Sequence, residues 1–218
     1  CSSDLEADFL ERRCMELADV AWSPSAYLLG WERDRDWKFP ERTFVQPYLT
    51  PKRTDPSTIA TGRTPVNEVV FFGRLEVRKG LVLFCDALQK LGAILSLAGE
   101  TRECRVTFLG KEWRVDGTPS VKYIRERTQH LPFSIEIITN KNRDEALEYL
   151  RQPGRLAVMP SLMDNLPFTV IECLGEGIPF LSSTVGGIPE LIAADQREHG
   201  ATAARHGLAY WMELARDP

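Results

Sequence analysis

Short apolar runs alternate with helical patterns along most of this chain, and this alternation limits the folds that it can adopt. From residue 69 onward the pattern is regular, and its first run, 69–72, is continuously apolar, which is typical of a strand buried on both faces. Each run is followed by a segment with apolar residues at helical spacing, for example 81–88. Such alternation predicts parallel strands joined by crossover helices. We therefore expect an α/β fold with a doubly wound, Rossmann-like parallel sheet.

The individual elements follow from the same patterns. Proline and small polar residues mark the expected starts of helices. The expected strands are 20–22, 43–46, 69–72, 106–109, 135–138, 156–159 and 179–182. The expected helices are 3–19, 23–31, one that contains 81–88, 121–130, 144–150, 167–174, one that begins at 187, and 201–214.

A change in composition divides the chain into parts. Residues 49–65 are rich in proline, threonine and basic side chains and have no apolar period, so we predict a linker there. The linker leaves a short N-terminal part, 1–48, and a larger part, 66–218, that contains the strand–helix alternation.

The composition excludes several functional classes. The chain has 218 residues, of which 43% are apolar and 27% charged, and its net charge of −4 gives no support for binding nucleic acid. No run of about 20 apolar residues is present to span a bilayer. Five cysteines without C-x-x-C spacing indicate neither a disulfide framework nor a zinc site. We expect a cytoplasmic protein, with peripheral attachment to a membrane left open.

A basic loop joins the first buried strand of the larger part to a helix, where ligands bind in doubly wound sheets. Three cations, Arg74, Arg78 and Lys79, lie beside the single acid Glu76. Cations near a helix N-terminus are mildly unfavourable, and a bound anion would reverse that effect. Arginine offers phosphate a planar fork and lysine a point charge, while Gly73 lets the backbone approach closely. Taken alone, the loop also fits a solvated basic turn.

A second loop, after the strand 156–159, leads into a helix that begins near Pro167. Proline suits the first helical position, and the amides of Phe168 and Thr169 would then point out of the helix end as an anion site. Because helical side chains lean toward the N-terminus, Glu172 can reach back to hydroxyl groups of a ligand bound there. Asp164 precedes the helix and can grip another hydroxyl.

The second loop also has a purely structural interpretation, in which Asp164 or Asn165 only caps the helix and Glu172 is solvated. Considered together, however, the two loops share one edge of the sheet. One loop supplies cations, and the other supplies helix amides flanked by carboxylates. This combination suits a diphosphate that carries sugars at both ends, which is a nucleotide sugar.

Four segments in order resemble the group 1 retaining glycosyltransferases. Residues 73–80 resemble the family's G-R-L-x-x-x-K-G segment, and 164–172 resemble its E-x7-E segment. The stretches 172–179 and 184–190 also look like that family. The resemblance covers about residues 66–195. It implies the GT-B fold, in which two Rossmann-like domains enclose a cleft.

The resemblance assigns a role to each part of the chain. It implies that 66–218 is the nucleotide-sugar donor-binding domain and that 1–48 is a remnant of the N-terminal acceptor domain. The remainder of that acceptor domain is then an expected partner, without which the chain alone is expected to be inactive. The histidine that family members contribute from the acceptor domain has no counterpart here.

The resemblance also assigns roles to the site residues. Arg74 and Lys79 would bind the diphosphate and stabilise charge on it as it leaves, and Asp164 would face the donor sugar, so these three are the expected catalytic residues. Glu172 would hold the ribose. The base would lie near the loops after the strands that end at 109 and 138. The remaining donor-binding residues expected are Gly73, Asn165, Leu166, Phe168 and Thr169, the last two through their backbone amides.

The expected reaction moves a hexosyl group from a nucleoside-diphosphate sugar, of UDP or GDP type, to the hydroxyl of a sugar, lipid or other acceptor. No tightly bound cofactor and no metal are expected, and the D-x-D triplet 34–36 ends a charged helix rather than a buried strand. The sequence departs from the family in having Asp164, one methylene shorter, as the first acid. Two alternatives remain open: a non-catalytic nucleotide-binding or interaction domain with the same fold, and a nucleotide-sugar epimerase.

Overall fold

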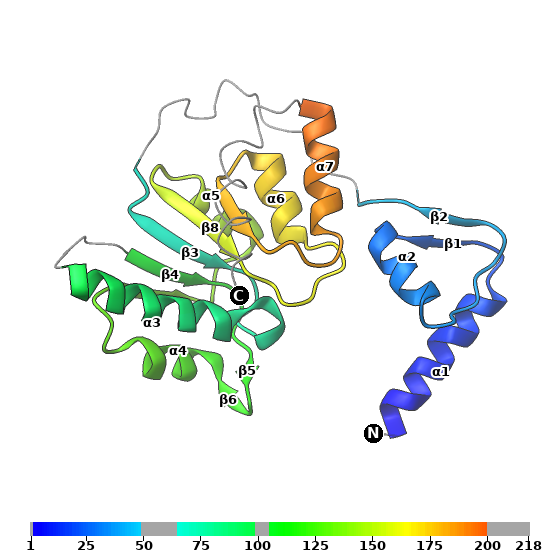
Figure 1. Ribbon diagram of the computed structural model, residues 1–218, viewed down its shortest axis with the longest axis horizontal. Coiled ribbons are helices and arrows are strands. Elements are labelled where there is room, and N and C mark those ends of the chain that lie inside the picture. Colours follow the sequence, from blue (N-terminus) through cyan, green and yellow to red (C-terminus); the bar gives the residue numbers. More distant parts are fainter. Residues whose placement is uncertain (1, 49–64, 99–104, 200–218) are drawn as a thin grey trace.

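A computed structural model describes residues 2–48, 65–98 and 105–199 of the chain (Figure 1). Its main sheet has five strands in the order β7-β4-β3-β8-β9, and every neighbouring pair is parallel. The strands of this sheet are β3 (Glu68–Phe72), β4 (Arg105–Leu109), β7 (Ser134–Ile138), β8 (Arg155–Met159) and β9 (Phe180–Ser182). The order reverses around β3, as in doubly wound sheets.

Helices cover both faces of this sheet (Figure 1). One face packs against α3 (Leu81–Ala98) and α4 (Ser120–Thr128), where three phenylalanines meet at the centre in tilted and edge-to-face contacts. The other face packs against α5 (Arg143–Leu150), α6 (Phe168–Glu176) and α7 (Ile188–His199). The expected α/β fold is therefore confirmed. The continuous apolar run 69–72 arises because β3 faces a helix layer on both sides.

The N-terminal part forms a small unit with its own two-stranded parallel sheet (Figure 1). Its elements are α1 (Ser2–Leu17), β1 (Ala21–Ser23), α2 (Ala26–Arg33) and β2 (Thr43–Val45). The side chain of Ser25 caps α2 by accepting a hydrogen bond from the amide of Leu28. Glu190 of α7, a helix packed on the main sheet, also caps the N-terminus of α2. Its two carboxylate oxygens accept hydrogen bonds from the amides of Ala26 and Tyr27 at 2.8 and 2.7 Å. The two units are thus joined through the start of α2.

The predicted element positions agree with the structure to within a few residues. The helix expected at 167 begins at Phe168 instead, because Pro167 has extended backbone and is the N-cap residue. The expected helix at 201–214 and nearly all of the expected linker, 49–65, lie outside the described residues.

The sequence interpretation missed two short elements. A 3-10 helix, η2 (Val77–Lys79), precedes α3, and a hairpin of β5 (Arg114–Val115) and β6 (Thr118–Pro119) precedes α4. Asp116 and Gly117 connect the hairpin with φ of 47° and 82°. An Asp-Gly pair is a common signal for a two-residue hairpin turn with left-handed backbone, so the sequence did contain this information.

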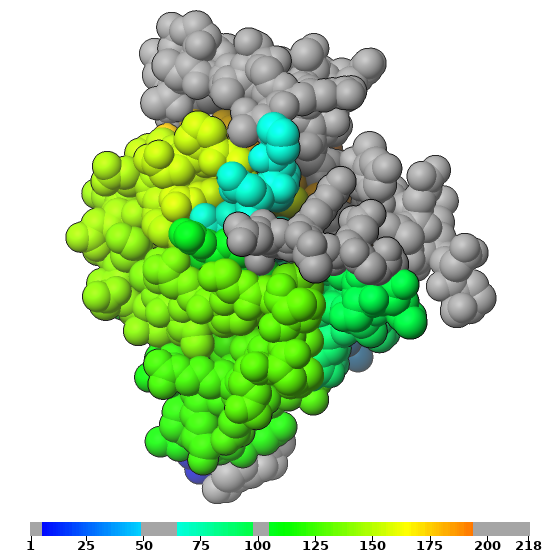
Figure 2. All heavy atoms as spheres, turned by 90° about the vertical axis from the view of Figure 1, so that its left-hand side faces the viewer, coloured from blue at the N-terminus to red at the C-terminus, as the bar shows by residue number. Residues whose placement is uncertain are grey.

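A cluster of buried charged and polar side chains lies where the strands of the main sheet begin. Figure 2 views the molecule from this side, with the segment that leads into β3 in cyan. Glu68 is 4% exposed and accepts hydrogen bonds from Thr107, Tyr149 and Arg155, the last at 2.7 Å. Burial alone would raise the pKa of Glu68, but these hydrogen bonds and the charge of Arg155 bring that pKa below its usual value. The ionised carboxylate therefore joins three strands and α5.

We predict that Arg155→Met lowers the free energy of unfolding by about 3–5 kcal/mol near pH 7, because it leaves the Glu68 carboxylate buried without its cation. In the wild type the pKa of Glu68 is lowered, so its contribution to stability is present at neutral pH and is lost as the pH falls through the folded-state pKa. In the variant that pKa rises, and the deficit should shrink as Glu68 takes up a proton.

Urea unfolding of both proteins near pH 7 and near pH 5 measures this change. The double variant Glu68→Gln/Arg155→Met removes the charge as well and is the control, in which the deficit should no longer depend on pH. An Arg155→Met deficit that is equal at both pH values would contradict the interpretation.

Candidate functional site

The carboxyl ends of the parallel strands bring the two predicted loops into contact. The loop after β3 packs on the loop after β8, where the amide of Leu162 donates to the carbonyl of Arg78 at 2.9 Å. Gly80 has φ of 81°, and a Cβ atom at this position would lie 1.9 Å from the carbonyl oxygen of Pro160. Only glycine permits this close approach.

Lys79 points across this contact to the start of the second loop. Its ammonium donates to Oδ2 of Asp164, and the hydroxyl of Ser161 lies 3.4 Å from the same oxygen. The side chains of Lys79 and Asp164 are 18% and 9% exposed. The interpretation of Asp164 as an N-cap is wrong, because its carboxylate binds Lys79 while Pro167 holds the cap position.

The N-terminus of α6 begins just after this ion pair. The carbonyl of Pro167 accepts hydrogen bonds from the amides of Val170 and Ile171 at 3.1 and 3.3 Å, so the helical ladder starts there. The amides of Phe168 and Thr169 precede the ladder, as expected for a helix end.

Leu166 and Asn165, which were also expected to bind the donor, make contacts within the protein. Leu166 is 5% exposed and packs in the core, so only its backbone is available to a ligand. The carbonyl of Asn165 accepts a hydrogen bond from the amide of Gly187 at 2.8 Å, which ties the segment to the loop after β9. The backbone of Gly186 also lies against that of Asp164, since a Cβ atom at Gly186 would be 1.5 Å from the carbonyl oxygen of Asp164. The whole segment is therefore fixed from two sides.

Glu172 lies on the second turn of α6 and is not solvated. Its side chain is 13% exposed, and its Oε1 accepts a hydrogen bond from Nε of Arg143 at 2.6 Å. This hydrogen bond and the negative charge of Glu172 raise the pKa of Arg143. The alternative in which Glu172 is a free surface carboxylate is wrong. Arg143 was not expected from the sequence.

Arg74 occupies a different side of the site from Lys79. Its guanidinium lies 5.2 Å from the centre of the Trp113 ring, and it is 3.8 Å from Oε2 of Glu76. Arg78 also pairs with Glu76, at 3.0 Å. Gly73 donates its amide to the carbonyl of Leu109, which places the start of this loop against the end of β4. The structure thus associates Lys79 with the β8 loop and Arg74 with the segment after β4.

Aromatic side chains flank the start of α6. Phe168 is 60% exposed and stacks on Tyr48, with ring centres 4.7 Å apart. Tyr48 in turn meets Trp22 of β1 edge to face. The side chain of Phe168 therefore contacts the N-terminal unit, while its backbone amide lies at the N-terminus of α6.

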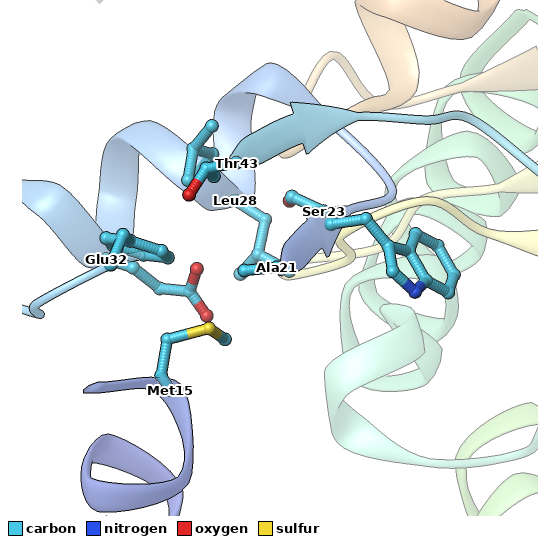
Figure 3. A pocket seen from close by; sticks show the side chains of 9 residues that line it. Met15, Ala21, Ser23, Leu28, Glu32 and Thr43 are labelled. Carbon is cyan, nitrogen blue, oxygen red and sulfur yellow. The ribbon is translucent and has the colours of Figure 1, made fainter. Parts of the chain in front are cut away.

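A small hollow in the N-terminal unit lies apart from these residues. It has a volume of about 40 Å³ and is lined by side chains of α1, β1, α2 and β2, including Met15 and Glu32 (Figure 3). Burial, with the nearby charge of Glu11, raises the pKa of Glu32. The hollow has room for water but not for a nucleotide.

The described residues contain no cluster of metal-ligand side chains, and two of their cysteines, Cys85 and Cys173, are buried. Within 2–48, 65–98 and 105–199, no group of three or more His, Cys, Asp or Glu side chains is arranged to hold a metal ion. Burial raises the pKa of the Cys85 thiol to about 12 and also raises the pKa of Cys173. Among these same residues, no helix is both long and apolar enough to cross a membrane.

Comparison with known proteins identifies the family to which this chain belongs. The family described as "Glycosyl transferases group 1" matches residues 66–211, which is more than half of the chain. The sulfoquinovosyl transferase SQD2 of Arabidopsis thaliana is 28% identical over 128 residues, which cover 59% of this chain and 21% of that protein.

Solved structures show the same fold at low sequence identity. Sucrose-phosphate synthase from Thermosynechococcus elongatus has a TM-score of 0.57 at 17% identity, with 91% of this chain and 53% of that chain covered. HepE from Anabaena, in complex with UDP-glucose, has a TM-score of 0.59 at 17% identity, with 81% and 48% covered. The chain spans about half the length of these structures and about a fifth of SQD2.

We predict that Gly80→Ala destabilises the protein much more than Gly117→Ala. The two glycines have φ of 81° and 82°, so both substitutions carry a similar backbone penalty of about 1 kcal/mol. Nothing lies within 4 Å of a Cβ at Gly117, whereas at Gly80 the Pro160 carbonyl blocks it. The collision should add at least about 2 kcal/mol.

The free energies of unfolding of the two variants, from urea titration, measure the difference. Equal losses would show that the close approach of the two loops does not contribute to stability.

Proposed function

The chain belongs to the group 1 glycosyl transferases, and on that premise we propose that residues 66–218 bind the donor, a nucleoside-diphosphate sugar, in a retaining glycosyltransferase. The N-terminal part, 1–48, then belongs to the acceptor domain, and the rest of that domain completes the cleft. The acceptor is a sugar, a lipid or another compound with a free hydroxyl. The chain's coverage of about half of the GT-B structures supports this division.

One observation carries the proposal: Lys79 reaches Asp164 at the start of the segment that leads into α6. A cation, the amides of a helix N-terminus and a carboxylate one turn further along the helix thereby lie at one edge of the sheet. Phosphate oxygens are favoured at a helix N-terminus because the unpaired amides and the helix dipole both attract negative charge. Glu172 supplies an acceptor for hydroxyl groups at a distance along the helix that suits a ribose next to the diphosphate.

The chemistry follows from where negative charge develops. In the transfer, the bond between the sugar's anomeric carbon and the β-phosphate oxygen breaks, and the electron pair leaves with the nucleoside diphosphate. The acceptor oxygen forms the new bond to that carbon and releases its proton. The ammonium of Lys79 and the amides of Phe168 and Thr169 would stabilise the charge on the leaving diphosphate, and such fixed donors are often the largest catalytic contribution.

Asp164 has a second task in this proposal. A lysine ammonium has three donors, so Lys79 can keep its bond to Asp164 while it donates to phosphate. The carboxylate then holds the ammonium in position before the donor arrives. Because the Asp164 side chain is only 9% exposed, any contact with the donor sugar is made by the edge that Lys79 does not occupy.

Arg74 would reach the diphosphate from the opposite side. Its side chain is 49% exposed and lies over Trp113, so the guanidinium is open to an anion from solvent. Glu76 balances Arg74 and Arg78 in the absence of a ligand.

We predict that Lys79→Gln weakens binding of nucleoside diphosphate by about 10- to 100-fold, the range expected for loss of one charge-assisted hydrogen bond. Thermal shift with UDP, GDP, ADP and dTDP first identifies the nucleotide that binds, and calorimetry then gives its dissociation constant. Because Lys79→Gln leaves Asp164 buried without its cation, the double variant Lys79→Gln/Asp164→Asn is measured as well and should show the same loss.

Arg78→Ala is the matched control for this measurement. Arg78 lies in the same loop, is 48% exposed and pairs only with Glu76 among the described residues. Its removal should change the affinity by less than about three-fold. Unchanged binding in both Lys79 variants, or no binding of any nucleotide by the wild type, would contradict the proposed donor site.

We predict that Glu172→Gln weakens binding of nucleoside diphosphate by about ten-fold but leaves binding of inorganic pyrophosphate unchanged, because a neutral amide accepts less strongly from ribose hydroxyls. Competition calorimetry with the two ligands separates the effects. Equal losses for both ligands would mean that Glu172 acts on the diphosphate or on folding rather than on the ribose.

A further inference from the structure

The start of α5 places an arginine beside the proposed ribose carboxylate. Asn142 caps this helix, since its side chain accepts from the amide of Glu145 at 3.0 Å while Glu145 accepts from the amide of Asn142 at 2.8 Å. This reciprocal capping box fixes where the helix begins. Arg143 is therefore the first helical residue, immediately after the loop that follows β7.

The ion pair between Arg143 and Glu172 is asymmetric. Arg143 Nε donates to Oε1 of Glu172 at 2.6 Å, and the side chains are 54% and 13% exposed. The glutamate is thus enclosed, while the arginine keeps much of its surface in solvent. Oε2 of Glu172 accepts no hydrogen bond from any side chain or amide in the described parts of the chain.

This geometry leaves one oxygen of an oriented carboxylate for a ligand. A glutamate side chain has three rotatable torsions, and a ligand that must order them binds more weakly. The strong charge-assisted bond to Arg143 orders the carboxylate in advance. It also connects α6 to the loop after β7, the loop near which the base is expected, so that base and ribose contacts keep a fixed spacing.

We propose that Arg143 is a positioning residue that orients Glu172 for the ribose hydroxyls and thereby makes the site discriminate ribonucleoside from 2′-deoxyribonucleoside diphosphates. This inference rests on the proposed function, because it takes the nucleoside diphosphate as the ligand. Arg143 acts through Glu172 and makes no direct contact with the reacting atoms.

A second arginine offers a closely matched control. Arg151, also from the end of α5, pairs with Glu176 of α6 at 2.8 Å, and the two side chains are 46% and 15% exposed. This pair joins the same two helices with similar geometry and exposure, but one helical turn further from the start of α6. A loss of helix packing should affect both arginine variants alike, whereas a loss of carboxylate orientation should affect only Arg143→Ala.

The test measures dissociation constants by calorimetry for UDP against 2′-deoxy-UDP and for GDP against 2′-deoxy-GDP. The wild type should favour the ribonucleotide that it binds by about ten-fold or more, since a hydrogen bond to a carboxylate is lost in the deoxy form. Arg143→Ala should reduce this preference to about two-fold by weakening the ribonucleotide alone. Arg143→Lys should restore part of it, and Arg151→Ala should retain it fully.

Each outcome decides the proposal. The positioning role is overturned if Arg143→Ala keeps the preference for the ribonucleotide, or if Arg151→Ala loses it to the same extent. Tighter ribonucleotide binding by Arg143→Ala would also overturn it, because the arginine would then block the carboxylate. A wild type that binds a nucleoside diphosphate without any preference would overturn this inference alone. A wild type that binds none would overturn the proposed function and this inference with it.

Discussion

The close contact between the loops after β3 and β8 determines the geometry of the candidate site. At Gly80 the backbone of one loop lies against the carbonyl of Pro160 in the other, with no space for a side chain. Because Lys79 directly precedes this contact, its ammonium is directed to Asp164 and toward the start of α6. Without this contact, the cation and the helix end would be on separate loops with no fixed relation. The rest of the site takes its position from α6 and from the helices packed against it.

Two enclosed carboxylates each hold a cation at this edge of the sheet. Asp164 holds Lys79, and Glu172 holds Arg143, so the main charges are ordered without a ligand. Such order has an advantage for electrostatic stabilisation, since groups that are already aligned need not reorganise when charge develops on a leaving group. It also carries a cost, because removing either cation leaves a largely buried carboxylate without its partner. Stability and binding are therefore linked through the same residues.

The chain illustrates how far local patterns carry a prediction. The strands and helices and the two loops that meet at the carboxyl ends of β3 and β8 could be recognised, because apolar periodicity and helix-end signals depend on neighbouring residues. The β5–β6 hairpin was missed although its Asp116-Gly117 turn was readable. The ion pair between Arg143 and Glu172 could not be predicted, since the residues around Arg143 give no indication of a partner 29 residues away. The link between Glu190 and the start of α2 was hidden for the same reason, at a separation of 164 residues.

Sequence alone determined the α/β class, the loops at the carboxyl edge and the resemblance that led to the family, because each depends on residue types within a short window. Only the tertiary structure decided which charges meet. It turned Asp164 from a possible helix cap into the partner of Lys79, 85 residues away, and Glu172 from a possible surface acid into an enclosed, oriented carboxylate. The physical reason is that an ion pair depends on the distance and burial of two side chains, and both are set by how strands and helices pack rather than by the order of residues along the chain.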